Sequence, residues 1–220
     1  MFHHGFKDLF KSIRDVKRYI NSLGVILHAI QLEINPIDYI GLEALRVFLP
    51  CVYQRIAENK SLILRESLLA DRQEPKHLEI KKELDQIFSA DGESFAKIAR
   101  DISLQLFPQL NQIYSIYSAG TGWNQKWRKD KRICSEKFFD TYFLLGAPDG
   151  EVSQVEIDMI IRKAAVAGDI FNYFDPYIKD SRIRELINGL NDRAEDLSTT
   201  QCKNLIPILF KLLNSLPDLR

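Results

Sequence analysis

The chain has 220 residues, of which 45% are hydrophobic and 27% charged, and its 30 basic side chains are balanced by 30 acidic ones. A neutral chain exerts no overall pull on nucleic acid or on an anionic membrane, so binding of either kind must come from a local patch. The three scattered cysteines fit a reducing compartment better than a disulfide framework. Because no apolar run approaches the roughly twenty residues of a membrane span, and the N-terminus lacks the apolar region of a signal peptide, we expect a cytoplasmic protein without a membrane span.

The stretch from Phe6 to Ile30 predicts a long amphipathic helix. Its apolar residues recur at helical spacing, and they are Phe6, Leu9, Phe10, Ile13, Val16, Ile20, Leu23, Leu27 and Ile30. Arg14, Arg18 and Asn21 lie together on a flank of this stripe, because residues at i, i+4 and i+7 stack on a helix.

A second helix is expected directly after a short hinge. Asn35 is a good N-cap, and Pro36 suits the first helical position, where its missing N–H is not needed. Glu43 and Arg46 are three residues apart and are expected to pair on the surface. Pro50 removes a backbone hydrogen bond, which predicts a kink or break near residues 46–47.

Caps and helix breakers divide the rest of the chain into further helices. A charged helical run continues from Val52 to about residue 69, and another helix opens at Pro75. The expected caps are Asp91 for residues 93–107, Ser135 for residues 136–143, Ser153 with Glu156 as a capping box for residues 154–167, and Ser198 or Thr199 for a last helix that Pro207 interrupts.

These elements predict an all-α fold, an irregular bundle of about eight to ten helices with no substantial sheet. We expect two helical subdomains, residues 1–132 and 133–220, within one compact unit. The apolar content of a chain of this length is sufficient for a substantial core.

Two blocks of the sequence carry a family resemblance. The first is SIRDVKRYINSL followed by LEINPIDYIGLEALRVFLPCVYQRI, and the second is RICSEKFFDTYFLLGAPDGEVSQVEI. In this order, over residues 6–161, they resemble the helical region that follows the nucleotide-binding core in KAP-family P-loop NTPases. The resemblance implies a helical part that covers the nucleotide or relays its state, and it implies that Arg14 and Arg18 face the γ-phosphate when a core is supplied. The alternative for the two arginines is an ion pair with Glu43 or Asp38.

The phosphate-binding motif of that family is missing from the chain. None of the ten glycines is followed by Lys-Ser or Lys-Thr, and no Walker B strand is recognisable. We therefore expect no enzyme activity from this chain alone, with ATP and Mg²⁺ bound only through a separate P-loop core domain. Whether such a core is lost, separately encoded or adjacent stays open at this point.

Two other functions remain open. The first is a stand-alone protein–protein interaction module of a bacterial defence or signalling system, with the apolar residues between Ser181 and Leu216 as the surface for a partner or a second copy. The second is nucleic-acid binding by Trp123, Lys126, Trp127 and Arg128, where aromatic and basic residues interleave. The family resemblance favours the alternative, in which the two tryptophans pack a surface loop onto the body, so we do not expect a nucleic-acid partner. No metal site or catalytic set is expected, and the adjacent His3 and His4 are interpreted as a solvated tail.

Overall fold

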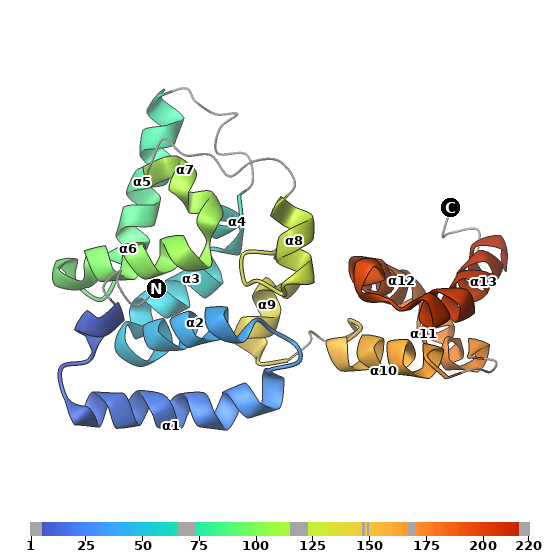
Figure 1. The fold of residues 1–220 in the computed structure, drawn as a ribbon. Helices are drawn as coiled ribbons and strands as arrows, with labels where there is room; N and C mark the ends of the chain where they lie inside the picture. The colour runs from blue at the N-terminus through green and yellow to red at the C-terminus, as the bar shows by residue number, and fades with distance from the viewer. Residues whose placement is uncertain are drawn as a thin grey trace. The chain divides into compact units, whose positions relative to one another are not determined.

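The computed structural model describes residues 6–65, 74–114, 123–146, 148, 150–166 and 170–215. These residues contain 13 α-helices and no strand, and ten of the helices have seven or more residues, so the all-α prediction is confirmed (Figure 1). The chain forms two compact units, which we call unit 1 (residues 1–145) and unit 2 (residues 146–220). None of the described helices is long and apolar enough to cross a bilayer.

Unit 1 contains nine of these helices after a short 3-10 turn at Phe6–Leu9. They are α1 (Ile13–Ile30), α2 (Pro36–Phe48), α3 (Pro50–Glu58), α4 (Lys60–Ile63), α5 (Glu74–Phe88), α6 (Glu93–Leu106), α7 (Asn111–Tyr114), α8 (Trp123–Lys129) and α9 (Glu136–Leu144). Unit 2 contains α10 (Gln154–Ala164), α11 (Asp175–Lys179), α12 (Ile183–Asp192) and α13 (Thr199–Ser215).

The two units divide after Leu145, which is later in the chain than the boundary at 132/133 that we expected. The reason is that α9 and the residues before it belong to the core of unit 1. Ile133, Phe138, Phe139 and Tyr142 are all buried there. Side chains that pack into one apolar core stay with it.

Several helix ends follow the local sequence. Asn35 caps α2 through hydrogen bonds from the amides of Ile37 and Asp38, with Pro36 at the first position as expected. The capping box of Ser153 and Glu156 is formed at the start of α10. Polar side chains at these positions satisfy amides that have no partner within the helix.

Other helix ends differ from the sequence predictions. The first helix starts at Ile13 rather than Phe6, because the Ser12 hydroxyl accepts a hydrogen bond from the Asp15 amide and caps α1 there. The break at Pro50 falls at Leu49, two to three residues later than expected, and α3 begins with the proline itself. A proline is tolerated at the first helical position, where no backbone donor is lost.

Asp91 and Pro207 also behave differently from the expectation. The Asp91 carboxylate does not cap α6; it accepts a hydrogen bond of 2.8 Å from the Val52 amide near the start of α3. Pro207 lies inside the continuous helix α13 and does not interrupt it. Tertiary structure thus overrides two local signals. Asp91 finds its partner on α3, and α13 continues through Pro207 while packed against α10.

The core of unit 1 is built around α2. This helix packs against α1, α3 and α6, and Tyr39, Leu42 and Leu45 on it are no more than 1% exposed. A helix that is covered on several sides holds its neighbours in place, so the position of α1 in unit 1 depends on α2.

In unit 2, α10 packs closely against α12 at Gly189. A methyl group added to Gly189 would lie 2.3 Å from Cδ1 of the buried Ile157. We expect Gly189→Ala to lower the free energy of unfolding of unit 2 by about 1–2 kcal/mol, because overpacking outweighs the gain in helix propensity. Urea unfolding followed by far-UV circular dichroism measures this change.

Gly24 in α1 is the matched control for Gly189. No atom lies within 4 Å of a methyl group added there, so Gly24→Ala is expected to stabilise the protein by about 0.5–1 kcal/mol. Equal effects of the two substitutions would contradict the close contact between α10 and α12.

Candidate functional site

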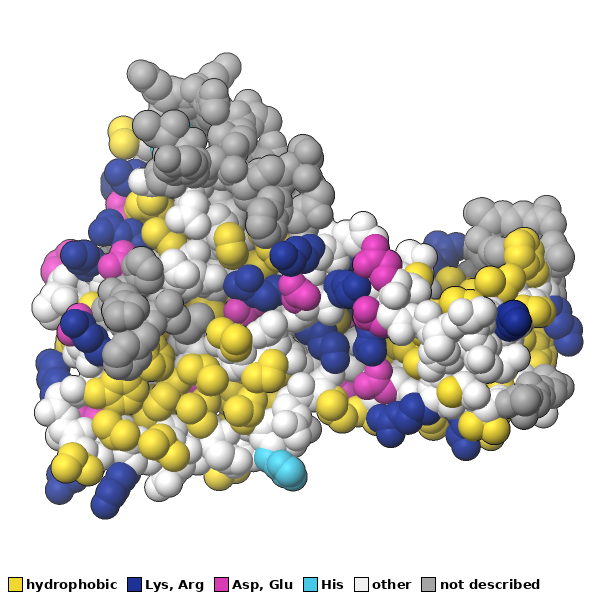
Figure 2. Space-filling model, viewed as in Figure 1, with side chains coloured by type: hydrophobic (Ala, Val, Ile, Leu, Met, Phe, Trp, Pro, Cys, Tyr) yellow, Lys and Arg dark blue, Asp and Glu magenta, His cyan; other side chains and the backbone are white. Residues whose placement is uncertain are grey.

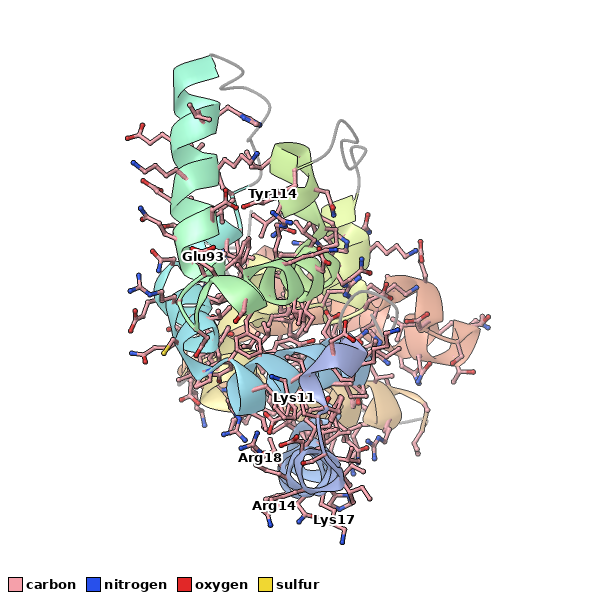
Figure 3. All side chains as sticks on the ribbon, turned by 90° about the vertical axis from the view of Figure 1, so that its left-hand side faces the viewer. Lys11, Arg14, Lys17, Arg18, Glu93 and Tyr114 are labelled. Atoms are coloured by element: carbon pink, nitrogen blue, oxygen red, sulfur yellow. The ribbon has the colours of Figure 1, made fainter. Side chains whose placement is uncertain are left out.

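The outer side of α1 exposes large aliphatic side chains together with basic ones. Ile13 is 76% exposed, Val16 37% and Ile20 58%. Arg14 and Lys17 are exposed next to them, and Figure 3 shows both pointing away from the body of unit 1. We call these five residues the α1 face. Figure 2 shows that hydrophobic side chains gather over the α1–α2 region of unit 1.

The opposite side of α1 is tied firmly to α2. The Tyr19 hydroxyl donates a hydrogen bond of 2.5 Å to the Ile40 carbonyl, and the Ser22 hydroxyl donates one to the Glu43 carboxylate. Burial, followed by the nearby Glu43 charge, raises the pKa of Tyr19, so the hydroxyl stays a donor. The α1 face is therefore held in a defined orientation, although within the described part of unit 1 nothing covers Ile13 and Ile20.

Glu43 lies under α1 as a buried ionic group and not on the surface, where we expected it to pair. Its side chain is 1% exposed, and Arg46 holds it through Nε at 2.7 Å and Nη2 at 2.6 Å. The Tyr39 hydroxyl donates a further hydrogen bond of 3.2 Å to the same carboxylate. A bidentate guanidinium and two hydroxyl groups saturate a carboxylate that would otherwise be costly to bury.

Neither of the ion pairs considered for Arg14 and Arg18 is formed. Glu43 is bound by Arg46 and Asp38 by Arg132. Arg18 lies 5.0 Å from the ring centroid of Phe48 and 3.9 Å from Asp15. Arg14 has no ion pair among the residues that the structure describes.

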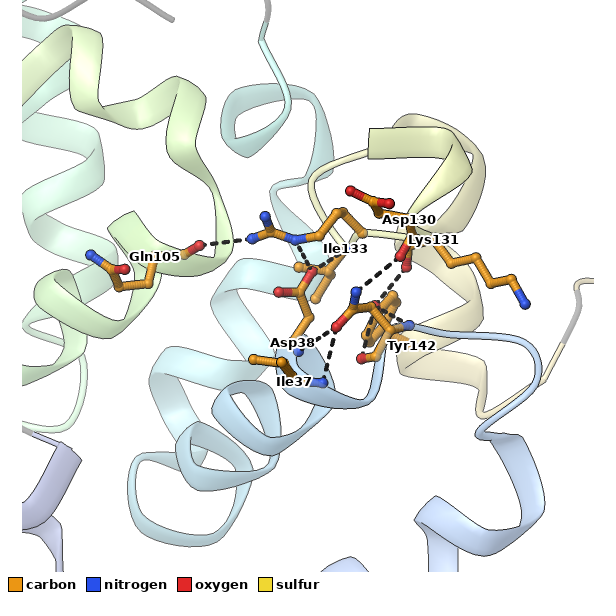
Figure 4. A network of polar contacts seen from close by, with 9 residues as sticks. Ile37, Asp38, Gln105, Asp130, Lys131, Ile133 and Tyr142 are labelled. Atoms are coloured by element: carbon orange, nitrogen blue, oxygen red, sulfur yellow. Dashed lines mark hydrogen bonds and ion pairs between the residues drawn. The ribbon is translucent and has the colours of Figure 1, made fainter. Parts of the chain in front are cut away.

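A buried polar network joins the start of α2 to the loop between α8 and α9 (Figure 4). The Asp38 carboxylate is 2% exposed and accepts hydrogen bonds from Arg132 Nε at 2.6 Å and from the Ile133 amide at 3.0 Å. Arg132 also donates to the Gln105 carbonyl at 3.0 Å. Burial raises the pKa of Asp38, and the Arg132 guanidinium and the Ile133 amide counter that rise.

Tyr142 completes this network from α9. Its hydroxyl accepts a hydrogen bond of 2.9 Å from the Asn35 amide and donates one of 2.7 Å to the Lys131 carbonyl. Asn35 donates in turn from Nδ2 to the Asp130 carbonyl at 3.0 Å. The sequence identified Asn35 as a cap, but it carried no signal that Tyr142 would reach it.

Part of the stretch considered for nucleic-acid binding, residues 123–132, is buried or hydrogen-bonded within unit 1. The Trp127 side chain is 7% exposed in the unit 1 core, and Arg132 and Lys131 bind Asp38 and the Leu32 carbonyl. Lys126 and Arg128 are exposed, while His3, His4 and the Trp123 side chain lie outside the described residues. A buried indole cannot stack on a base, so Trp127 does not offer the platform that the pattern suggested.

No group of three or more His, Cys, Asp or Glu side chains that could hold a metal ion occurs among the described residues. No protein-family model, curated protein or solved structure matches the chain. The α1 face is consequently the site on which we base a function.

Proposed function

We propose that this chain is the non-catalytic helical portion of a KAP-type P-loop NTPase, and that the α1 face docks it onto the nucleotide-binding core. The main support is the exposure of Ile13 and Ile20 on a helix whose other side is locked to α2. Clustered exposed aliphatic side chains on a soluble protein mark interaction surfaces. The likeness of residues 6–161 to the KAP helical region supplies the identity of the partner.

Arg14 and Arg18 fit the role of nucleotide-facing residues within this proposal. Neither binds Glu43 or Asp38, so both guanidinium groups stand at the protein surface. An arginine that reaches the γ-phosphate stabilises the charge that develops during phosphoryl transfer. ATP and Mg²⁺ are then cofactors of the core and not of this chain.

The docking test uses an ATP·Mg²⁺-loaded KAP-type core domain, titrated with the purified chain by calorimetry. We expect Ile20→Asp to weaken binding at least about tenfold, because a buried charge replaces an apolar anchor. Leu144→Asp is the control, since Leu144 is 65% exposed and lies on α9, outside the α1 face. Equal losses from both variants, or no binding by the unmodified chain, would refute the docking proposal.

A second experiment separates docking from nucleotide sensing. The chain alone is expected to show no Mg²⁺-dependent ATP hydrolysis, because it has no phosphate cradle. When the core is present, replacing Arg14 and Arg18 by alanine should lower turnover by about 10³-fold if an arginine contacts the transferred group. Turnover by the pure chain would overturn the proposal, and unchanged turnover of the double variant would exclude the arginines from this role.

Unit 2 supports a second candidate function, a protein–protein interaction module. Ile206 is 49% and Phe210 is 62% exposed on α13, at i and i+4 on one side of the helix. Light scattering tests self-association through this surface. A dimer that Phe210→Ser dissociates would support it, and a strict monomer at high concentration would count against it.

A further inference from the structure

Helices α5 and α6 enclose a groove in unit 1 with a volume of about 690 Å³. Leu78, Phe88 and Ala96 contribute apolar lining, and Lys81, Lys82 and Arg100 contribute positive charge. Figure 3 shows Glu93 beside the base of α5 and Tyr114 higher up, between α5 and α7. A groove of this size is typical of small-molecule sites, which combine apolar walls with a few polar groups.

Helices α5 and α6, which form the two walls of the groove, each place a basic side chain near the ring of Tyr114. Lys81 Nζ of α5 lies 5.9 Å from the Tyr114 ring centroid, and Arg100 Cζ of α6 lies 5.4 Å from it. Both side chains are half-buried, and neither forms an ion pair with any residue that the structure describes. An arginine has five N–H donors, and Arg100 has only the ring as its described partner.

The nearby carboxylates leave the groove with a cationic excess. Asp85 accepts a hydrogen bond of 2.7 Å from the Tyr114 hydroxyl, which occupies one of its oxygens. Glu93 is exposed at the start of α6. Three cations thus face two carboxylates in the lining, and no described residue supplies a hydrogen-bond acceptor for the half-buried guanidinium of Arg100.

We propose that this groove binds a small phosphate-bearing ligand, with Arg100 and Lys81 holding the phosphate oxygens and Leu78 packing against its apolar part. A planar guanidinium matches two phosphate oxygens at once, and an ammonium group adds a point charge. The site is separate from the α1 face and does not depend on the KAP proposal.

The test is a titration of the full chain with inorganic pyrophosphate at constant ionic strength, followed by calorimetry and by amide chemical shifts. We expect saturable binding that shifts the amides of α5 and α6. Arg100→Gln should weaken it at least about tenfold, because charge-assisted hydrogen bonds are lost. Lys97→Gln is the control, because Lys97 is an exposed cation on α6 outside the groove lining.

Three results would overturn the proposal. They are the absence of saturable pyrophosphate binding, an equal loss of affinity in Arg100→Gln and Lys97→Gln, and citrate binding as tight as that of pyrophosphate. Lys81→Gln serves as a second variant if Arg100→Gln does not fold, and it too should weaken pyrophosphate binding.

Discussion

Replacing Arg132 by methionine is expected to destabilise unit 1 by about 3–5 kcal/mol, because it leaves a buried carboxylate without its cation. Asp38 is 2% exposed, and its remaining described donor in this network is the Ile133 amide at 3.0 Å. Both tryptophans belong to unit 1, so urea unfolding followed by tryptophan fluorescence reports on this unit. Arg55→Met, which replaces an exposed arginine of α3, should change stability by less than about 0.5 kcal/mol.

The Arg132→Met defect should also depend on pH. Burial raises the pKa of Asp38 and Arg132 counters that rise, so removing Arg132 lifts the pKa in the folded state further above its unfolded value. A carboxyl with a raised folded pKa stabilises the fold below its unfolded pKa and loses that contribution as pH rises. The deficit of Arg132→Met is therefore expected to be smallest below about pH 4 and to grow toward neutral pH. A deficit that is constant with pH would show that Asp38 is not the cause.

Arg46→Ala is expected to cost about 3–5 kcal/mol, more than Glu43→Ala at about 1–3 kcal/mol, although the two substitutions break the same ion pair. The reason is the difference in exposure, since the Glu43 side chain is 1% exposed and that of Arg46 is 39% exposed. Removal of Arg46 leaves the Glu43 carboxylate buried and without its cation, whereas removal of Glu43 leaves the Arg46 guanidinium, which water can reach. Equilibrium unfolding by tryptophan fluorescence measures both variants.

A double substitution at Glu43 and Arg46 provides the control for this asymmetry. Adding Glu43→Ala to Arg46→Ala removes the stranded carboxylate, so the double variant should be more stable than Arg46→Ala alone. If the double variant is the least stable of the three, the cost comes from lost packing between α1 and α2 and not from the unpaired charge.

The ion pairs Arg132–Asp38 and Arg46–Glu43 explain why the basic side chains of α1 remain at the surface. Asp38 and Glu43 were the acidic partners that the sequence offered to Arg14 and Arg18, but Asp38 is bound by Arg132 and Glu43 by Arg46. Arg46 gives Glu43 two hydrogen bonds, and Arg132 and the Ile133 amide give Asp38 one each, so neither carboxylate has much to gain from a second guanidinium. The α1 face accordingly keeps its positive charge beside its exposed aliphatic side chains, which is the combination on which the docking proposal depends.

The sequence by itself determined the all-α class and those helix ends that depend on adjacent residues. Asn35 with Pro36 and the box of Ser153 with Glu156 act within one turn of backbone, so a short window contains every group that they need. Only the tertiary structure decided that Ile13 and Ile20 face outward, that Arg132 binds Asp38, and that α9 belongs to unit 1. Helical periodicity shows which residues share a side of a helix but not which neighbour covers it, and partners separated by 94 positions meet only when the whole core has formed.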